Sequence, residues 1–152
     1  MIGDLLLYQR DGLYDKGIEW LTRSKWTHAA QDIGDGMLIE SYPGIGVRQR
    51  IYMDNEPDMG RFRVKDSNPD IYKLHLSWLF DQIGKDYNWP GIFGFALNDV
   101  DLSNPLKWFC SSLVITYQEM CGYVLIKKDE RLVAPGDLAD SPLLIQLDVN
   151  EE

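Results

Sequence analysis

The chain has 152 residues, a net charge of −9 and a sequence pI of about 4.6. Hydrophobic residues make up 45% and charged residues 26%, which is ordinary for a globular domain with a real core. The acidic balance argues against nucleic acid or an anionic membrane as the main partner, because both require a basic surface. We expect one domain that spans residues 1–152.

The first residues hold only a short apolar run, Leu5 to Tyr8, before Gln9 and Arg10. A signal peptide needs a longer apolar segment, and no later run approaches the roughly 18 apolar residues of a membrane span. These features predict a cytoplasmic protein without integral membrane association, with delivery by a phage or another export route left open. They do not indicate an oligomeric state.

Apolar and alternating segments predict β-strands in the first half of the chain. Residues 3–8 are apolar enough for a buried strand, and residues 26–42 form two strands around the hairpin signal Gly34-Asp35-Gly36. Residues 45–53 and 60–65 alternate with period two, so each strand should have one wet face. Those faces carry Arg48, Arg50, Arg61, Arg63 and Lys65. We interpret them as solvated edge charges, with a binding patch for an acidic ligand group as the alternative.

Helical spacing predicts three helices, at residues 14–25, 70–84 and 107–121. The second has Asn68 as its N-cap, Pro69 in its first turn and Gly84 at its end. Its apolar stripe is predicted to comprise Ile71, Leu74, His75, Trp78, Leu79 and Ile83, with His75 as a packed histidine.

The rest of the chain adds shorter elements. The aromatic stretch 87–105 is either a loop with a short helix or an apolar wall beside a site. Residues 123–128 are expected as a strand, 133–138 as a turn and 143–148 as a final strand. Helices around a mainly antiparallel set of strands make an α+β domain.

Two cysteines, Cys110 and Cys121, fall on the third predicted helix. Eleven residues of helix separate their Cα atoms by roughly 16 Å, which is too far for a disulfide, so both are expected as free thiols. His28 and His75 are distant in sequence and no CxxC is present. We therefore expect no metal-ligand cluster and no cofactor.

Cys110 has two interpretations. It lies on the apolar stripe of its helix, and free cysteine is among the most buried residue types, so locally a core thiol is favoured. A nucleophile is the alternative, because the partial positive charge of a helix N-terminus lowers the pKa of a thiol. That effect requires the helix to begin at Phe109 or Cys110 rather than at Pro105.

His28 and Glu40 are the candidate base and orienting group, on the two strands of the predicted hairpin. Facing residues of an antiparallel pair have numbers with a constant sum. A sum of 68 places Glu40 opposite His28, and 70 places it diagonal to His28 on the same face. A sum of 69 turns it to the other face. A three-residue loop over Gly34–Gly36 gives 70, and a two-residue loop gives 69.

Six segments occur in an order that resembles the circularly permuted NlpC/P60 branch of papain-like proteins, the YiiX-like group. They are GDLLLY, WLTRSKWTHAA, LIESYPGIGVRQR, GKDYNWPGIFGF, KWFCSSLV and VAPGDLADSP. In that branch the His and its polar partner precede the Cys helix, as His28, Glu40 and Cys110 do here. Ser112 is a departure, because an acidic residue is frequent at its position.

The resemblance implies a permuted papain-like fold, in which the Cys-bearing helix packs on a small antiparallel sheet or barrel. It matches Cys110 to the nucleophile, His28 to the general base and Glu40 to the polar third member. It implies a cysteine peptidase or amidase that acts on cell-wall peptides or amino-acid amides through a thioester acyl-enzyme. Relatives that act on acyl lipids make a thiolesterase or acyltransferase the alternative. A non-catalytic binding or structural module on the same fold is a further alternative.

Overall fold

The computed structural model describes residues 1–10, 24–88, 107–129 and 132–147. Its centre is a six-stranded antiparallel sheet with the strand order β4-β3-β2-β1-β5-β6. The strands are β1 (Leu5–Tyr8), β2 (His28–Gly34), β3 (Met37–Tyr42), β4 (Gly46–Ile51), β5 (Met59–Val64) and β6 (Leu144–Leu147). The described helices are α2 (Pro69–Phe80), α4 (Cys110–Met120) and α5 (Pro135–Ala139). The α+β class is confirmed, and the sheet is open rather than a closed barrel.

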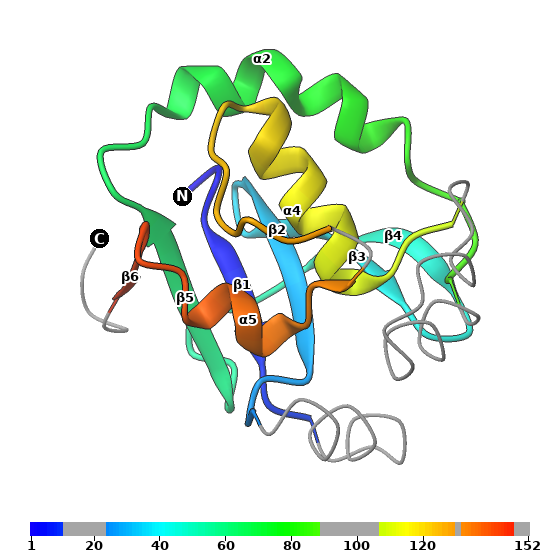
Figure 1. Cartoon of the computed structure of the whole chain (residues 1–152). Coiled ribbons are helices and arrows are strands. Elements are labelled where there is room, and N and C mark those ends of the chain that lie inside the picture. The colour runs from blue at the N-terminus through cyan, green and yellow to red at the C-terminus, as the bar shows by residue number, and fades with distance from the viewer. Residues whose placement is uncertain (11–23, 89–106, 130–131, 148–152) are drawn as a thin grey trace.

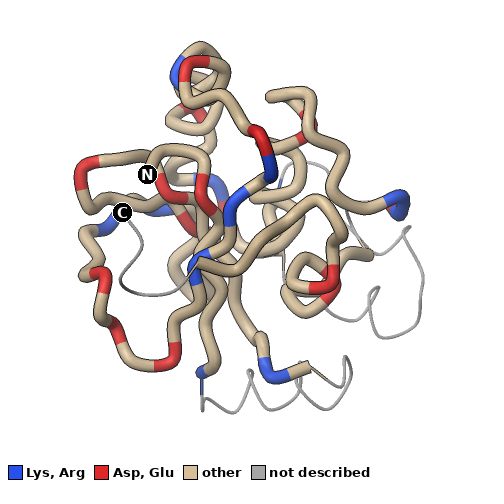
Figure 2. Tube along the Cα trace, turned by 90° about the vertical axis from the view of Figure 1, so that its left-hand side faces the viewer, with Lys and Arg blue, Asp and Glu red and all other residues tan. Residues whose placement is uncertain are grey.

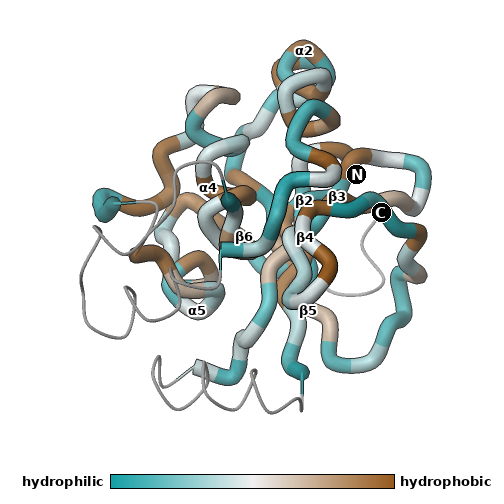
Figure 3. The backbone as a smooth tube through the Cα atoms, turned by 90° about the vertical axis from the view of Figure 1, so that its right-hand side faces the viewer, coloured by the Kyte–Doolittle hydropathy of each residue, from teal (hydrophilic) through white to brown (hydrophobic). Residues whose placement is uncertain are grey.

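The described helices cover one face of the sheet. α4 and α5 lie in front of the strands and α2 crosses above α4 (Figure 1), and the view turned by 90° shows α4 and α5 on one side of the strands (Figure 3). Alternate residues of β1 point to opposite faces. Leu5 and Leu7 pack against Val114 and Ile115 of α4. Leu6 belongs to a separate apolar cluster on the other face.

The hairpin of β2 and β3 has the register that matters for the candidate site. Gln31 pairs with Ile39 and Asp32 with Leu38, so facing numbers sum to 70, and the register shifts by one at Gly34. The predicted sum of 70 is confirmed, but the three-residue loop is not: Gly34 pairs with Met37, so Asp35 and Gly36 alone connect the strands, and the irregularity between Asp32 and Gly34 sets the register. Continued along the strands, it places Glu40 on the same face as His28.

The predicted start of α2 is confirmed, but the predicted set of buried apolar residues is not. The side chain of Asn68 accepts a hydrogen bond from the Asp70 backbone N–H at 2.9 Å, and α2 ends at Phe80 rather than at residue 84. Leu74 is 75% exposed, whereas Tyr72 is buried. The reason is that the Tyr72 ring fills the space beside Gly3, where a Cβ would collide with it. The buried face of the helix is therefore rotated toward Tyr72.

Two predictions for the last third of the chain are wrong. Residues 123–128 form no strand, because Leu125 enters the core and its carbonyl accepts from Ser141 Oγ at 2.7 Å instead of joining a ladder. Residues 133–138 are not a simple turn, because α5 begins at Pro135 with Asp137 accepting from the Ala134 backbone N–H at 2.8 Å. The final strand is confirmed as β6.

The helix expected at 14–25 lies outside the described residues except for 24 and 25, and the stretch 87–105 lies outside them except for 87 and 88. Among the residues that are described, no helix has the length and apolar character needed to cross a membrane. Cys110 and Cys121 are both free thiols, as expected.

Candidate active site

α4 begins at Cys110, later than the start near Asn104 or Lys107 that the spacing indicates. Phe109 is the N-cap, with extended backbone angles (φ −84°, ψ 156°). Ser112 fixes this start, because its Oγ accepts from the Phe109 N–H and donates to the Phe109 carbonyl, both at 3.0 Å. The serine at the position where relatives often have an acidic residue therefore caps the helix. Cys110 is the first helical residue, which is the condition that the nucleophile interpretation requires.

Trp108, two residues before the start of α4, is hydrogen-bonded to the sheet and to the chain after α2. The Trp108 carbonyl accepts from Ser41 Oγ of β3 at 2.7 Å and from the Asn88 N–H at 3.1 Å. The indole Nε1 of Trp108 donates to Gln82 at 3.0 Å. Ser111 Oγ donates to the Val133 carbonyl on the other side of the helix. These bonds fix the start of α4 against β3.

The thiol of Cys110 is enclosed. Cys110 is 1% exposed and packs with Tyr87 and Phe109. Burial raises the pKa of the thiol to about 12, although backbone N–H groups of Ala29 and Ser111 that hydrogen-bond to it act in the opposite direction. In the resting site desolvation outweighs the effect of the helix terminus, so the pKa of this thiol is raised rather than lowered. The contact with Ala29 places the thiol beside the residue that follows His28.

We predict that iodoacetamide alkylates Cys110 in the folded protein more slowly than in urea-unfolded protein at pH 7. Because the thiolate is the reacting species, the folded-state rate should rise about tenfold per pH unit up to about pH 10. Peptide mapping after timed quenching measures the rate at each cysteine, with the unfolded chain as the control. A rate that is already constant below pH 7 would contradict the raised pKa.

His28 and Glu40 form a buried hydrogen-bonded pair. His28 is the first residue of β2, and its Nε2 lies 2.7 Å from Glu40 Oε2, with the two side chains 4% and 0% exposed. The imidazole also lies near the rings of Tyr8 and Tyr42, with centroids at 6.0 and 5.8 Å. An ionised Glu40 accepts, so Nε2 donates, and Nδ1 is then the acceptor nitrogen of the neutral ring.

Glu40 is held ionised by an arginine cluster, defined as Arg10, Arg48 and Arg50. Arg48 donates to Glu40 Oε1 from Nε at 2.9 Å and from Nη2 at 2.7 Å, and Arg50 Nε adds a bond at 3.3 Å. Burial alone would raise the pKa of Glu40. Hydrogen bonds from His28 and Arg48 and the charge of Arg50 outweigh burial, and the pKa falls to about 2.

The cluster corrects the interpretation of the arginines as solvated edge charges. Arg48 and Arg50 share a sheet face with Glu40, and β4 pairs Glu40 directly with Arg48. On β5, Arg63 binds the buried Asp4 through Nε at 2.7 Å and Nη2 at 2.8 Å. In Figure 2, basic positions in the middle of the trace lie near acidic positions, while other acidic positions lie on outer loops. The period-two pattern of residues 45–53 was the sequence signal for this cluster, because it puts Arg48 and Arg50 on one face of the sheet.

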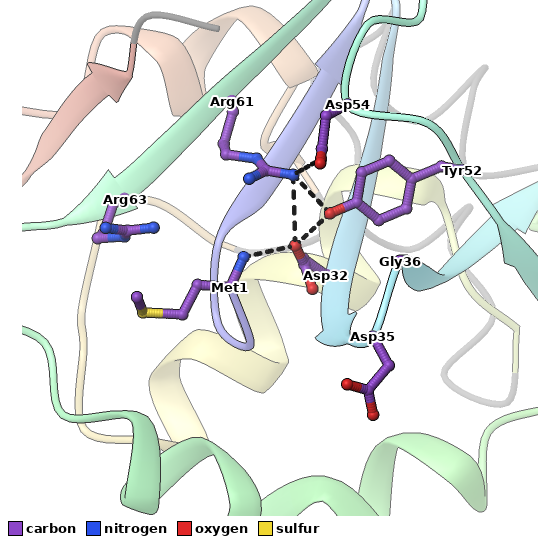
Figure 4. Close-up of a pocket in the computed structure, with 8 residues that line it drawn as sticks. All are labelled: Met1, Asp32, Asp35, Gly36, Tyr52, Asp54, Arg61 and Arg63. Carbon is purple, nitrogen blue, oxygen red and sulfur yellow. Dashed lines mark hydrogen bonds and ion pairs between the residues drawn. The ribbon is translucent and has the colours of Figure 1, made fainter. Parts of the chain in front are cut away.

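The structure has two hollows among the described residues. Cys110, His28 and Glu40 line neither of them. One of about 220 Å³ surrounds Asp32, whose carboxylate accepts from Tyr52 and forms an ion pair with Arg61 (Figure 4). Its charged groups bind one another, so it is a structural ion network. The other, of about 500 Å³, is a largely apolar groove between residues 124–128 and 140–143.

Sequence comparison gives no relative: neither a protein-family profile nor a curated protein matches the chain. Structure comparison finds a protein of similar fold. The crystal structure of the metalloprotein YiiX from Escherichia coli O157:H7, described as DUF1105, matches with a TM-score of 0.74 at 14% sequence identity. The match covers 97% of this chain and 96% of that one. The chain has a YiiX-like fold.

YiiX is called a metalloprotein, which raises the question of whether this chain has side chains that could hold a metal ion. Within residues 1–10, 24–88, 107–129 and 132–147, no group of three or more His, Cys, Asp or Glu side chains could hold a metal ion. The carboxylate of Glu40 is also occupied by His28 and two arginines. The described residues therefore do not fit a metal site.

Proposed function

We propose that the chain is a cysteine-dependent hydrolase of amide bonds, with the circularly permuted NlpC/P60 arrangement of a papain-like site. Cys110 is the nucleophile, His28 the general base and Glu40 the group that orients His28. The substrate is a peptide or an amino-acid amide. The YiiX-like fold and the chain order His28, Glu40, Cys110 agree with this proposal.

One arrangement supports the proposal: β2 and β3 hold a buried His–Glu pair, and the thiol of the first residue of α4 contacts the residue that follows His28. The 2.7 Å contact of His28 Nε2 with Glu40 fixes the tautomer in which Nδ1 accepts a proton. The hydrogen bond from the Ala29 N–H to the thiol brings Cys110 next to that histidine. Base, orienting group and nucleophile are thus supplied by β2, β3 and α4.

In the first half of the reaction, Cys110 transfers its thiol proton to His28 Nδ1 as the sulfur attacks the substrate carbonyl carbon. The carbonyl π electrons move to oxygen, and N–H groups of the first turn of α4 stabilise the oxyanion, because they lack acceptors within the helix. Glu40 stabilises the imidazolium. When the C–N bond breaks, the leaving amine takes the proton from His28 and a thioester remains.

In the second half, His28 removes a proton from water, and the hydroxide oxygen attacks the thioester carbon. The C–S bond breaks, the carboxylic acid leaves, and the proton returns from His28 to Cys110. Because burial raises the pKa of the resting thiol, the proposed mechanism has His28 remove the proton during the attack rather than before it. His28 is therefore required for nucleophilicity itself.

Acyl-donor probes test this function. We propose to treat the protein with 4-nitrophenyl esters of an N-acetyl amino acid and of a fatty acid, and to locate the acyl group by peptide mapping. The expected result is acylation of Cys110 and not of Cys121, faster with the aminoacyl ester. Cys121→Ala should retain the labelling and Cys110→Ala should lose it. A label on Cys121, or none above the unfolded control, contradicts the proposal, and a preference for the fatty-acyl ester supports a thiolesterase or acyltransferase instead.

A non-catalytic binding module is the second candidate, and the burial of Cys110 favours it. A thiol that is 1% exposed with a raised pKa also suits a core position. The same probe experiment separates the two, because a module without nucleophile chemistry should show no acylation of Cys110 that depends on His28.

A further inference from the structure

The arginine cluster around Glu40 contains two arginines that hydrogen-bond directly to its carboxylate. Arg48 donates hydrogen bonds from Nε and Nη2 to Glu40 Oε1. Arg50 binds Glu40 through Nε, Glu56 through Nη1 at 2.9 Å and Nη2 at 3.2 Å, and the Tyr8 hydroxyl through Nη2 at 2.9 Å. Their positions are accounted for by these acceptors.

Arg10 differs from both. Its Nη2 lies 3.6 Å from Glu40 Oε2, the oxygen that His28 already occupies at 2.7 Å. No acceptor in the described part of the chain lies within hydrogen-bond distance of its guanidinium, although the side chain is only 23% exposed. The guanidinium is instead held between the rings of Tyr8 and Tyr42, 5.0 Å from each centroid. Within the described residues, the half-buried guanidinium of Arg10 therefore has donors without a hydrogen-bond acceptor.

The balance of charges around Glu40 also indicates that a negatively charged partner for Arg10 is lacking among the described residues. Among the groups that the structure describes here, three arginines face two carboxylates, Glu40 and Glu56, and this leaves one positive charge in excess on a chain of net charge −9. The excess charge lies at the candidate site. Tyr8 and Tyr42, which hold Arg10, also flank the His28 ring, and the charge of Arg10 acts on the Cys110 thiol.

We propose that Arg10 binds a carboxylate of the substrate. This inference rests on the proposed hydrolase and narrows its substrate class to amides or esters with a free carboxylate near the scissile bond. The planar guanidinium matches a carboxylate with two parallel hydrogen bonds. One excess positive charge balances a carboxylate, whereas a phosphate monoester carries nearly two negative charges. Arg10 is thus a specificity-determining residue beside the reacting groups.

The test is a binding measurement that needs no turnover. In Cys110→Ala protein, NMR titrations compare acetate, N-acetylglycine and N-acetyl-dialanine with the uncharged amide of each, using the His28 ring signals. The carboxylate should bind about tenfold more tightly than its amide in at least one pair. Arg10→Gln should abolish that preference and Arg10→Lys should retain part of it. The control Lys73→Gln removes an equal charge at the exposed Lys73–Asp70 pair and should leave the preference unchanged.

Equal binding of carboxylate and amide in all three pairs overturns the inference, as does a preference that survives Arg10→Gln. Methyl phosphate binding more tightly than acetate overturns the assignment to carboxylates. A spectrum of Arg10→Lys with native dispersion shows that the result does not reflect unfolding. Because Cys110 is absent, a carboxylate preference would stand even if the acylation experiment failed, so the two proposals fail separately.

Discussion

Glu40→Gln should lower the free energy of unfolding by about 3 kcal/mol at pH 7, because removal of one partner leaves buried charges uncompensated. Glu40 is fully buried, and its carboxylate accepts from Arg48, Arg50 and His28. An uncharged amide of the same shape cannot balance the arginines. Urea denaturation of the variant and the parent measures the difference.

The matched control for this prediction is Asp70→Asn. Asp70 pairs with Lys73 at 3.0 Å, but the two side chains are 81% and 63% exposed, so its loss should cost less than about 1 kcal/mol. If Glu40→Gln is no more costly than this control, the carboxylate does not hold the sheet face together.

The same prediction has a pH dependence with a fixed sign. The pKa of Glu40 is lowered from 4.5 to about 2 in the folded protein, so the folded state binds fewer protons than the unfolded state between these values. The stabilisation, about 3 kcal/mol, is complete above pH 4.5 and is lost as the pH falls toward 2. The difference between the parent and Glu40→Gln should therefore shrink across this range.

Cys110→Ala and His28→Ala should each reduce kcat/KM of the proposed hydrolase by at least about a thousandfold. The double variant should be no slower than Cys110→Ala alone, since the two groups act in one step. Cys121→Ala is the control, because Cys121 is a buried thiol of the same chain that packs with Tyr117 and Leu113, away from the proposed reacting groups. Its kcat/KM should stay within about twofold of the parent, while additive losses for Cys110 and His28 would contradict a shared step.

The site was predictable from sequence where a local pattern sets the geometry. The Gly34-Asp35-Gly36 segment indicated the hairpin and the sum of 70 that places Glu40 on the face of His28, although Gly34 pairs with Met37 and an irregularity beside it sets that register. The start of α4 was not predictable, because it depends on the Ser112 cap and on the bond between Ser41 and Trp108, which joins residues 67 positions apart. Propensity alone extends the helix toward Lys107.

Burial and long-range pairing account for the other differences. The period-two pattern places Arg48 and Arg50 on one face, but it cannot show that a buried Glu40 on β3 meets them there and excludes water. The pKa of Cys110 is likewise a property of what encloses the thiol, which a helix terminus in the sequence does not reveal. Tyr72 displaces Leu74 from the buried face of α2 because Gly3, far away in sequence, makes room for its ring.

The measurement that tests the central claim most directly is the single-turnover acylation of Cys110 by an aminoacyl 4-nitrophenyl ester in the parent and in His28→Ala. If His28 activates the thiol during attack, the parent should release one nitrophenolate per chain in a burst, with the acyl group on Cys110. His28→Ala should then acylate at least about a hundredfold more slowly at pH 7. Equal burst rates in the two proteins would contradict the account.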